Sequence, residues 1–338
     1  MNVTIVKDNQ QGTSLISQNF YYWGMGVLHV AIVAFNVLGI VTNAINTVVF
    51  VKQGVTSDSI SVSLFAMSVS DFLSSVLIFP QLVCYYLDTF DLTSVKGCYI
   101  VTSVVTTYPH IMCTKFTCLI QTYISLERAV CVVLPLHVRR AFKVKNTVIV
   151  NVVCCIVIFI IFTPYTFTVQ FTTVREKSNS THIVLILTSL GQTLGHINYI
   201  ISSFVINNTS ICVISVATVV TLTRLNVTRK WRESVFHSQR NTDDTKARRL
   251  SAKSLELTKT VTVITTIYLI CLLCSQLPAM TVFSLPGMSE TGENKYLYQI
   301  VYTLRFDMEA MHSSLNLFFY LKLSSKYREV FYSLFRMN

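Results

Sequence analysis

The chain has 338 residues, of which 52% are hydrophobic and only 13% are charged. Soluble proteins usually carry about 25% charged residues, so this composition argues against a soluble enzyme. It also excludes a disordered chain, which needs low hydrophobicity and a high charge density. The net charge of +11 takes its meaning from where the basic residues lie.

Seven mostly apolar stretches follow one another along the chain, and each has about the 20 residues that a membrane-spanning helix needs. Segments such as 149–162 are apolar on every side, which favours lipid over the buried core of a soluble protein. We therefore predict an all-α membrane protein, a seven-transmembrane helix bundle with a short amphipathic eighth helix. The predicted spans are about 25–52, 59–87, 98–134, 147–169, 190–225, 255–285 and 296–321.

The segment after the seventh span has the pattern of a helix that lies on a membrane surface. Its apolar residues recur on one face, with basic residues elsewhere. They are Leu323, Tyr327, Val330, Phe331, Leu334 and Phe335. The chain then divides into an outer N-terminal segment (1–24), a membrane domain (25–321) and a cytoplasmic amphipathic helix with a short tail (322–338).

The basic residues indicate the orientation in the membrane. If the N-terminus is outside, 20 of the 27 Lys and Arg residues fall on the inner side. Inner loops of membrane proteins carry this excess, so we predict a multi-pass protein of the plasma membrane with an extracellular N-terminus and a cytoplasmic C-terminus. The excess then needs no nucleic-acid partner. The sequons at Asn2 and Asn179 would face outward and accept glycans.

Several motifs lie in order along these stretches. Asn43 lies in the first span and Asp71 in the second, and Glu127-Arg128 lies near the inner end of the third. Pro278 lies in the sixth span, and the seventh ends in Asn316-Leu-Phe-Phe-Tyr320. Together they resemble the rhodopsin-like (class A) family of G-protein-coupled receptors, from about Asn36 to Phe335. Residues 122–138 look most like invertebrate peptide and chemosensory receptors.

This resemblance implies a receptor and not an enzyme. Such a receptor binds an extracellular ligand, here a peptide or a small chemosensory molecule, and activates a heterotrimeric G protein beside membrane lipids. The alternative is a transporter or channel, although such proteins often show repeated halves, and this sequence shows no such repeat.

The resemblance also implies an activation switch. It consists of Asn43, Asp71, Glu127, Arg128, Pro278, Asn316 and Tyr320. Arg128 is held either by Glu127 or by an acid on the sixth helix, and Pro278 favours a kink there. Asp71, Thr117, Ser313 and Asn316 match positions that line a sodium pocket in many members, so a sodium ion is a candidate allosteric modulator. A purely structural hydrogen-bond network is the other interpretation. No other cofactor is expected.

The family binds ligands between the outer halves of its helices. The matching residues here are His110, Thr114, Lys115, Gln276, Met280, Phe283, Tyr302, Phe306 and Glu309. Charges inside a span usually pair or serve function. Lys115 and Glu309 therefore form an ion pair across the pocket, or one of them meets a charged ligand. His110 stands where amine receptors carry an aspartate, so a biogenic amine is not expected.

The cysteines depart from the family pattern. The family links the third helix to the second outer loop, but no cysteine lies between Cys155 and Cys212. Cys84 and Cys98 both fall near the outer surface. They either pair with each other or remain free thiols, because connectivity does not follow from sequence.

Overall fold

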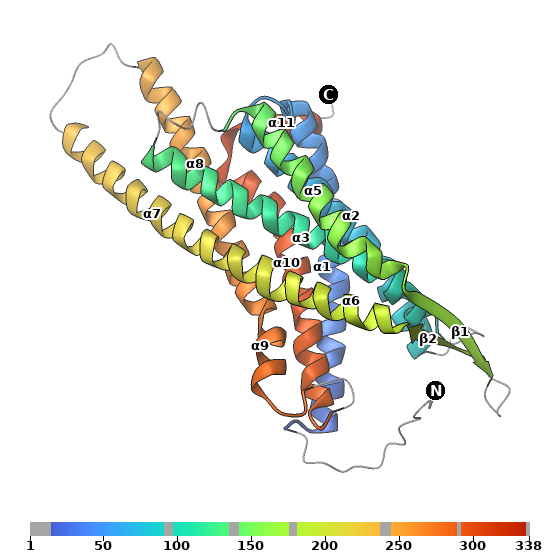
Figure 1. Ribbon diagram of the computed structural model, residues 1–338. Helices are drawn as coiled ribbons and strands as arrows, with labels where there is room; N and C mark the ends of the chain where they lie inside the picture. The colour runs from blue at the N-terminus through green and yellow to red at the C-terminus, as the bar shows by residue number, and fades with distance from the viewer. Residues whose placement is uncertain are drawn as a thin grey trace.

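A computed structural model of the protein describes residues 15–90, 97–134, 142–175, 181–236, 245–288 and 292–335. Helices predominate, and one antiparallel hairpin interrupts them (Figure 1). In chain order the elements are α1 (Gln18–Gln53), α2 (Ser59–Thr89), α3 (Cys98–Val133), α5 (Val144–Thr166), β1 (Val169–Arg175), β2 (Thr181–Leu187), α6 (Ser189–Tyr199), the π-helix η1 (Ile200–Asn207), α7 (Asn208–Phe236), α8 (Thr245–Ser275), α9 (Leu277–Ser284), α10 (Lys295–Leu323) and α11 (Ser325–Phe335).

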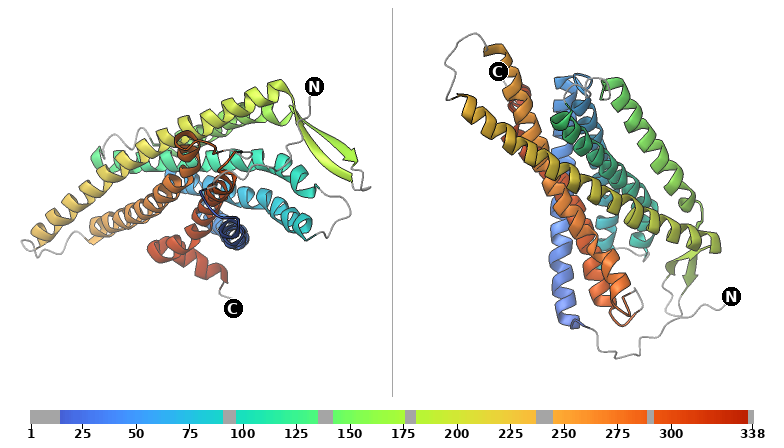
Figure 2. Two further views of the ribbon diagram at one scale, coloured as in Figure 1. Left: turned by 90° about the horizontal axis from the view of Figure 1, so that it is seen from below. Right: turned by 60° about the vertical axis from the view of Figure 1, so that its left-hand side comes forward.

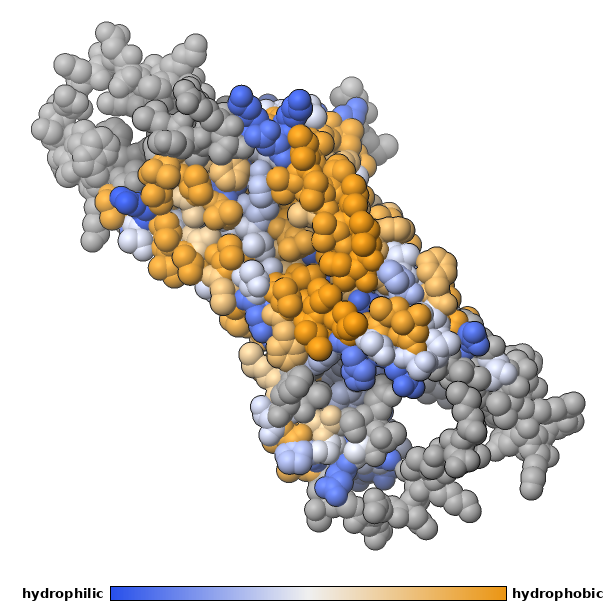
Figure 3. Space-filling model, in the orientation of Figure 1, coloured by the Kyte–Doolittle hydropathy of each residue, from blue (hydrophilic) through white to orange (hydrophobic). Residues whose placement is uncertain are grey.

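Membrane-spanning length and apolar composition occur together in five helical stretches of the described residues. These are α1, α2, α3, α5 and the continuous stretch Ser189–Val227. Apolar side chains on the outside of α5, such as Phe159 and Ile160, are largely exposed. Figure 3 shows apolar residues across the middle of the visible face, with polar residues gathered toward both ends. A helical membrane protein is therefore confirmed.

The helices pack as a closed bundle. α1 contacts α2, α2 contacts α3, and α3 contacts both α5 and α7. α8 then lies between α7 and α10, and α10 returns to α1 (Figure 2). The beginning of α1 and α11 lie at opposite ends of this bundle (Figure 1). We call these the hairpin end, which also holds β1, β2 and α9, and the α11 end.

The hairpin is a departure from the all-α prediction. β1 and β2 pair antiparallel from Val169 opposite Leu187 to Arg175 opposite Thr181. Both strands are rich in Val, Thr and Ile, which favour extended backbone. The fourth predicted span extended to 169, whereas α5 ends at Thr166 and the chain turns into β1.

Two helices of the bundle are interrupted in their backbone. The π-helix η1 joins α6 to α7, and π turns in helices often occur at functional sites. The sixth predicted span is divided at Gln276 into α8 and α9, with Pro278 in the first turn of α9. Proline cannot donate a helical hydrogen bond, which explains the division.

The largest apolar cluster lies toward the α11 end. It brings together Met67 of α2, Ile124 of α3, Leu317 of α10 and Tyr327 of α11. α11 therefore packs against the bundle through one face, as the spacing of its apolar residues predicts.

Candidate functional site

Asp71 lies inside the bundle with both carboxylate oxygens engaged. Its Oδ1 accepts a hydrogen bond of 2.8 Å from the Thr117 hydroxyl, and its Oδ2 accepts one of 3.2 Å from Asn316 Nδ2. The side chains come from α2, α3 and α10, so this carboxylate ties three helices together. Neutral donors from neighbouring helices are the usual partners of polar groups in a membrane.

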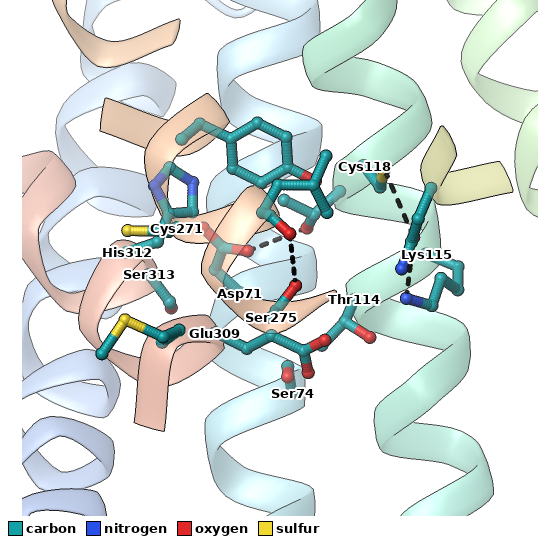
Figure 4. A pocket seen from close by; sticks show the side chains of 15 residues that line it. Asp71, Ser74, Thr114, Lys115, Cys118, Cys271, Ser275, Glu309, His312 and Ser313 are labelled. Atoms are coloured by element: carbon teal, nitrogen blue, oxygen red, sulfur yellow. Dashed lines mark hydrogen bonds between the residues drawn. The ribbon is translucent and has the colours of Figure 1, made fainter. Parts of the chain in front are cut away.

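Asn43 extends this network into α1. Its Nδ2 donates to both the carbonyl and the hydroxyl oxygen of Ser313, at 3.0 Å each. Ser313, Asp71 and Thr117 also line one cavity of about 40 Å³, shown in Figure 4. Oxygen ligands suit a sodium ion, and the volume is enough for an ion or a few waters. The four residues predicted for a sodium site are thus brought together, with the Ser313 hydroxyl accepting from Asn43.

A second polar path, which the sequence did not predict, runs toward α11. Asn46 Nδ2 donates to Asn43 Oδ1 over 3.3 Å, and Tyr327 donates to Asn46 Oδ1 over 2.6 Å. Tyr320 is buried beside Tyr327, with ring centroids 5.3 Å apart. The spacing of Tyr327 showed only that its ring faces the bundle, because its hydroxyl partner is 281 residues away in the chain.

Glu127 and Arg128 form an ion pair near the α11 end of α3. Arg128 Nη2 lies 3.1 Å from Glu127 Oε1, which also accepts a hydrogen bond from the Ser59 hydroxyl. Both side chains are buried. Arg128 faces a small cavity whose other walls come from α7 and α8, including Thr221 and Thr265. The side chain of Glu256, an acid on the sixth predicted span, is outside the described residues.

The charges near the hairpin end are arranged differently from the predicted ion pair. Lys115 and Glu309 have no contact within 4 Å, although both line the cavity of Figure 4. Glu309 instead lies 3.4 Å from Arg305 Nε and 3.7 Å from His110 Nε2. The predicted Lys115–Glu309 pair is therefore wrong, because Arg305 reaches the same carboxylate from the preceding turn of α10.

Arg305 is a residue of this cluster that the sequence analysis does not single out. Its side chain is buried in the bundle with 7% exposed. The four-residue spacing of Arg305 and Glu309 was the available signal, since such residues are neighbours on a helix.

Lys115 finds its partner on the π-helix. Its Nζ donates a hydrogen bond of 2.9 Å to Asn207 Oδ1. The sequence predicts no role for Asn207, which lies within the fifth predicted span. The π-helix ends at this residue and places it at the cavity wall.

A larger cavity of about 360 Å³ lies toward the hairpin end. Tyr302 and Phe306 line it, as the pocket prediction requires, whereas Thr114 lines the smaller cavity with Lys115. Its other walls are largely aromatic and were not predicted: His29, Tyr85, Tyr99, Tyr108 and Tyr165.

Neither Gln276 nor Met280 of the sixth predicted span lines these cavities, to which α8 instead contributes Tyr268, Cys271, Leu272 and Ser275. Met280 is 55% exposed and faces away from the bundle, because α9 begins a new helix after Gln276. Gln276 is buried but lines neither cavity. The side chains of Pro278 and Phe283 lie outside the described residues.

The structure joins Cys84 and Cys98 in a disulfide between the end of α2 and the beginning of α3, with Cα atoms 5.3 Å apart. This is one of the two arrangements that the sequence left open. The glycosylation sites predicted at Asn2 and Asn179 lie outside the described residues. Within the described residues, no three His, Cys, Asp or Glu side chains form a group that could hold a metal ion.

Comparison with known proteins agrees with this arrangement. The family model of the 7 transmembrane receptor (rhodopsin family) matches residues 42–320, which is most of the chain. No curated protein matches the chain. The match begins beside Asn43 and ends at Tyr320, so it covers the Asp71 network, the Glu127–Arg128 pair and the cavity walls apart from His29 and Ile32 of α1. The chain therefore belongs to the rhodopsin family of seven-transmembrane receptors.

Proposed function

We propose that this receptor binds an extracellular ligand at the hairpin end and activates a heterotrimeric G protein at the α11 end. It performs no covalent chemistry itself. The observation that carries the proposal is the buried Glu127–Arg128 pair beside a cavity between α3, α7 and α8. Breaking this pair would free Arg128 at the cavity between α3, α7 and α8, where a cytosolic partner would enter.

The division of the sixth span supplies a hinge for that change. α8 and α9 are separate helices joined at Gln276, so α8 is able to move at the α11 end while α9 stays near the ligand. A two-state hinge of this kind is biased by any ligand that binds one state better than the other.

The ligand site that we propose comprises the cavity of Figure 4 and the larger cavity toward the hairpin end. The outer one has about 360 Å³, within the usual range for small-molecule pockets, and its aromatic walls suit a peptide side chain or a small chemosensory molecule. Phe306 and Thr107 line it, and Glu309 and His110 lie one turn further along the same helices. A ligand in the outer cavity would therefore meet the Arg305–Glu309–His110 cluster.

The proposed topology has seven spans. α1, α2, α3, α5, the stretch from α6 to α7, α8 and α10 cross the membrane, and α11 lies on the inner leaflet. The opposite positions of the beginning of α1 and of α11 support an odd number of crossings. The hairpin end is then extracellular, and the receptor resides in the plasma membrane, where basic residues of the inner side meet acidic lipids.

A sodium ion is the proposed modulator of the Asp71 cavity. Asp71, Thr117 and Ser313 would supply oxygen ligands, while Asn316 orients the carboxylate through its hydrogen bond. A bound cation would hold α2, α3 and α10 in the arrangement described above.

The test is a signalling assay in cells that express the receptor with a panel of G proteins. Peptide and small-molecule libraries are screened for agonists, and every response is repeated with Arg128→Ala. We expect the response to be lost in this variant at equal surface expression. Lys52→Ala is the matched control, because it removes an exposed cation from the end of α1.

A full response from Arg128→Ala would show that Arg128 is not part of the switch. Ligand-dependent ion flux without any G protein would instead favour a channel or transporter.

A further inference from the structure

Lys115 is a buried cation that lacks an anionic partner. Its side chain is 1% exposed, and among the described residues no carboxylate lies within 4 Å of its Nζ. Its hydrogen bond goes to the neutral amide oxygen of Asn207. An ammonium group carries three donors, and a charge inside a membrane protein is normally paired.

Asn207 adds a second unused donor at the same place. Its side chain is fully buried, and its Nδ2 has no hydrogen-bond partner among the described residues. Because Oδ1 accepts from Lys115, the amide is turned so that Nδ2 remains to donate. Leaving a buried donor without an acceptor is unfavourable, so an acceptor in this position would be stabilising.

Both carboxylates on the same cavity face groups other than Lys115. Asp71 accepts from Thr117 and Asn316, and Glu309 lies against Arg305 and His110. His312, the other titratable group on this wall, packs against the Tyr268 ring. In Figure 4, Lys115 projects from α3 on one side of the cavity, and Asp71, Glu309 and His312 lie on the other. Near the hairpin end, two cations, Lys115 and Arg305, therefore face one carboxylate.

We propose that Lys115 and Asn207 form a binding site for one singly charged anionic group. The cavity of about 40 Å³ has room for a halide ion or for the carboxylate at the end of a longer ligand, and for little more. Lys115 would supply the charge and Asn207 Nδ2 a directed hydrogen bond. The proposal that the anion is the carboxylate of a longer ligand rests on the proposed function, since such a ligand would enter through the outer cavity.

The test is anion-dependent thermal unfolding of the purified, full-length receptor, with no G protein present. Sodium concentration is held constant, and sodium isethionate, a bulkier sulfonate that carries no carboxylate, is replaced by sodium chloride or by sodium acetate. Because an anion that binds the folded state stabilises it, we expect the unfolding midpoint to rise by about 2–4 °C. A rise with chloride alone identifies a free halide as the occupant, and a rise with acetate identifies a carboxylate group.

Two variants locate the effect. Lys115→Met removes the ammonium group, and we expect the anion response to vanish. Asn207→Asp places a carboxylate beside Lys115, so the midpoint in isethionate should rise and the response to added anion should again disappear. Lys52→Met, which makes the same change of net charge at an exposed position, should keep the full response.

The proposal is overturned if neither chloride nor acetate shifts the wild-type midpoint relative to isethionate. It is also overturned if the shift is as large in Asn207→Asp as in the wild type, a comparison that stands even if Lys115→Met does not fold. Failure of the receptor function would appear separately, in the Arg128 signalling assay.

Discussion

Single charged side chains in this bundle differ in how well they are neutralised. Asp71 is held by two neutral donors, whereas Glu309 is shared by Arg305 and His110. Because Arg305 is buried, its charge depends on Glu309. Removing the charge of Glu309 should therefore destabilise the bundle.

Glu309→Gln should lower the surface level and the thermal unfolding midpoint of the receptor. The change leaves Arg305 as an uncompensated buried charge, and breaking a buried pair typically costs about 3–5 kcal/mol. The double variant Arg305→Gln with Glu309→Gln should recover most of the loss, and Glu329→Gln on the exposed side of α11 is the control. A changed agonist potency at unchanged stability would instead assign Glu309 to the ligand.

Tyr327 lends itself to a test at the same scale. Tyr327→Phe removes the donor to Asn46 while keeping the ring in place, so Asn46 Oδ1 loses its partner. We expect a loss of about 1 kcal/mol in unfolding free energy, measured by thermal unfolding. Tyr332→Phe is the control, since Tyr332 is on the same helix and 57% exposed. Equal effects of the two changes would contradict a specific role for the hydrogen bond.

Whole helices are positioned by close approach as well as by polar contacts. α1 and α2 meet at Gly39, where an added Cβ atom would lie 2.8 Å from the Ser75 hydroxyl oxygen. Atoms do not approach so closely without a shift of the side chain or the backbone. Small residues at such crossings let helix backbones pack in a membrane.

Gly39→Ala should therefore lower the thermal unfolding midpoint, by about 1–3 kcal/mol of stability, as for other overpacked sites. Gly26→Ala, in the same helix, should have little effect, because an added Cβ atom there meets nothing within 4 Å. Adding Ser75→Ala to Gly39→Ala should restore part of the stability. An equal loss of stability from Gly26→Ala would contradict a packing effect specific to Gly39.

Across the whole molecule, the distribution of charge and the arrangement of the ends lead to one topology. The basic excess of the predicted inner side and the position of α11 agree, and the hairpin end carries the disulfide and the outer cavity. Under the proposed topology, the sequons of Asn2 and Asn179 are expected outside the cell.

Asn2→Gln and Asn179→Gln should each remove one glycan, seen as a faster-migrating band, and enzymatic deglycosylation should no longer shift the band of the double variant. Asn226→Gln is the matched control, because its sequon lies near the far end of α7, on the predicted inner side. A glycan that is lost only in Asn226→Gln would reverse the orientation.

The sequence alone was sufficient to predict the membrane class, the order of the helices and the residues around Asp71 and Arg128. Apolar length, basic asymmetry and motif order are local properties, and each can be read without knowing which helices touch. The face of α11 was predictable for the same reason, since it depends only on spacing along one helix.

The pairing of charged side chains inside the bundle could be identified from the tertiary structure alone. Arg305 forms an ion pair with Glu309 of the same helix. Lys115 instead donates a hydrogen bond to Asn207, 92 residues away in the chain. The π-helix and the break at Gln276 rotate the residues that follow them, so Asn207 turns inward and Met280 outward. Such rotations depend on packing among distant helices, and neither residue spacing nor composition records them.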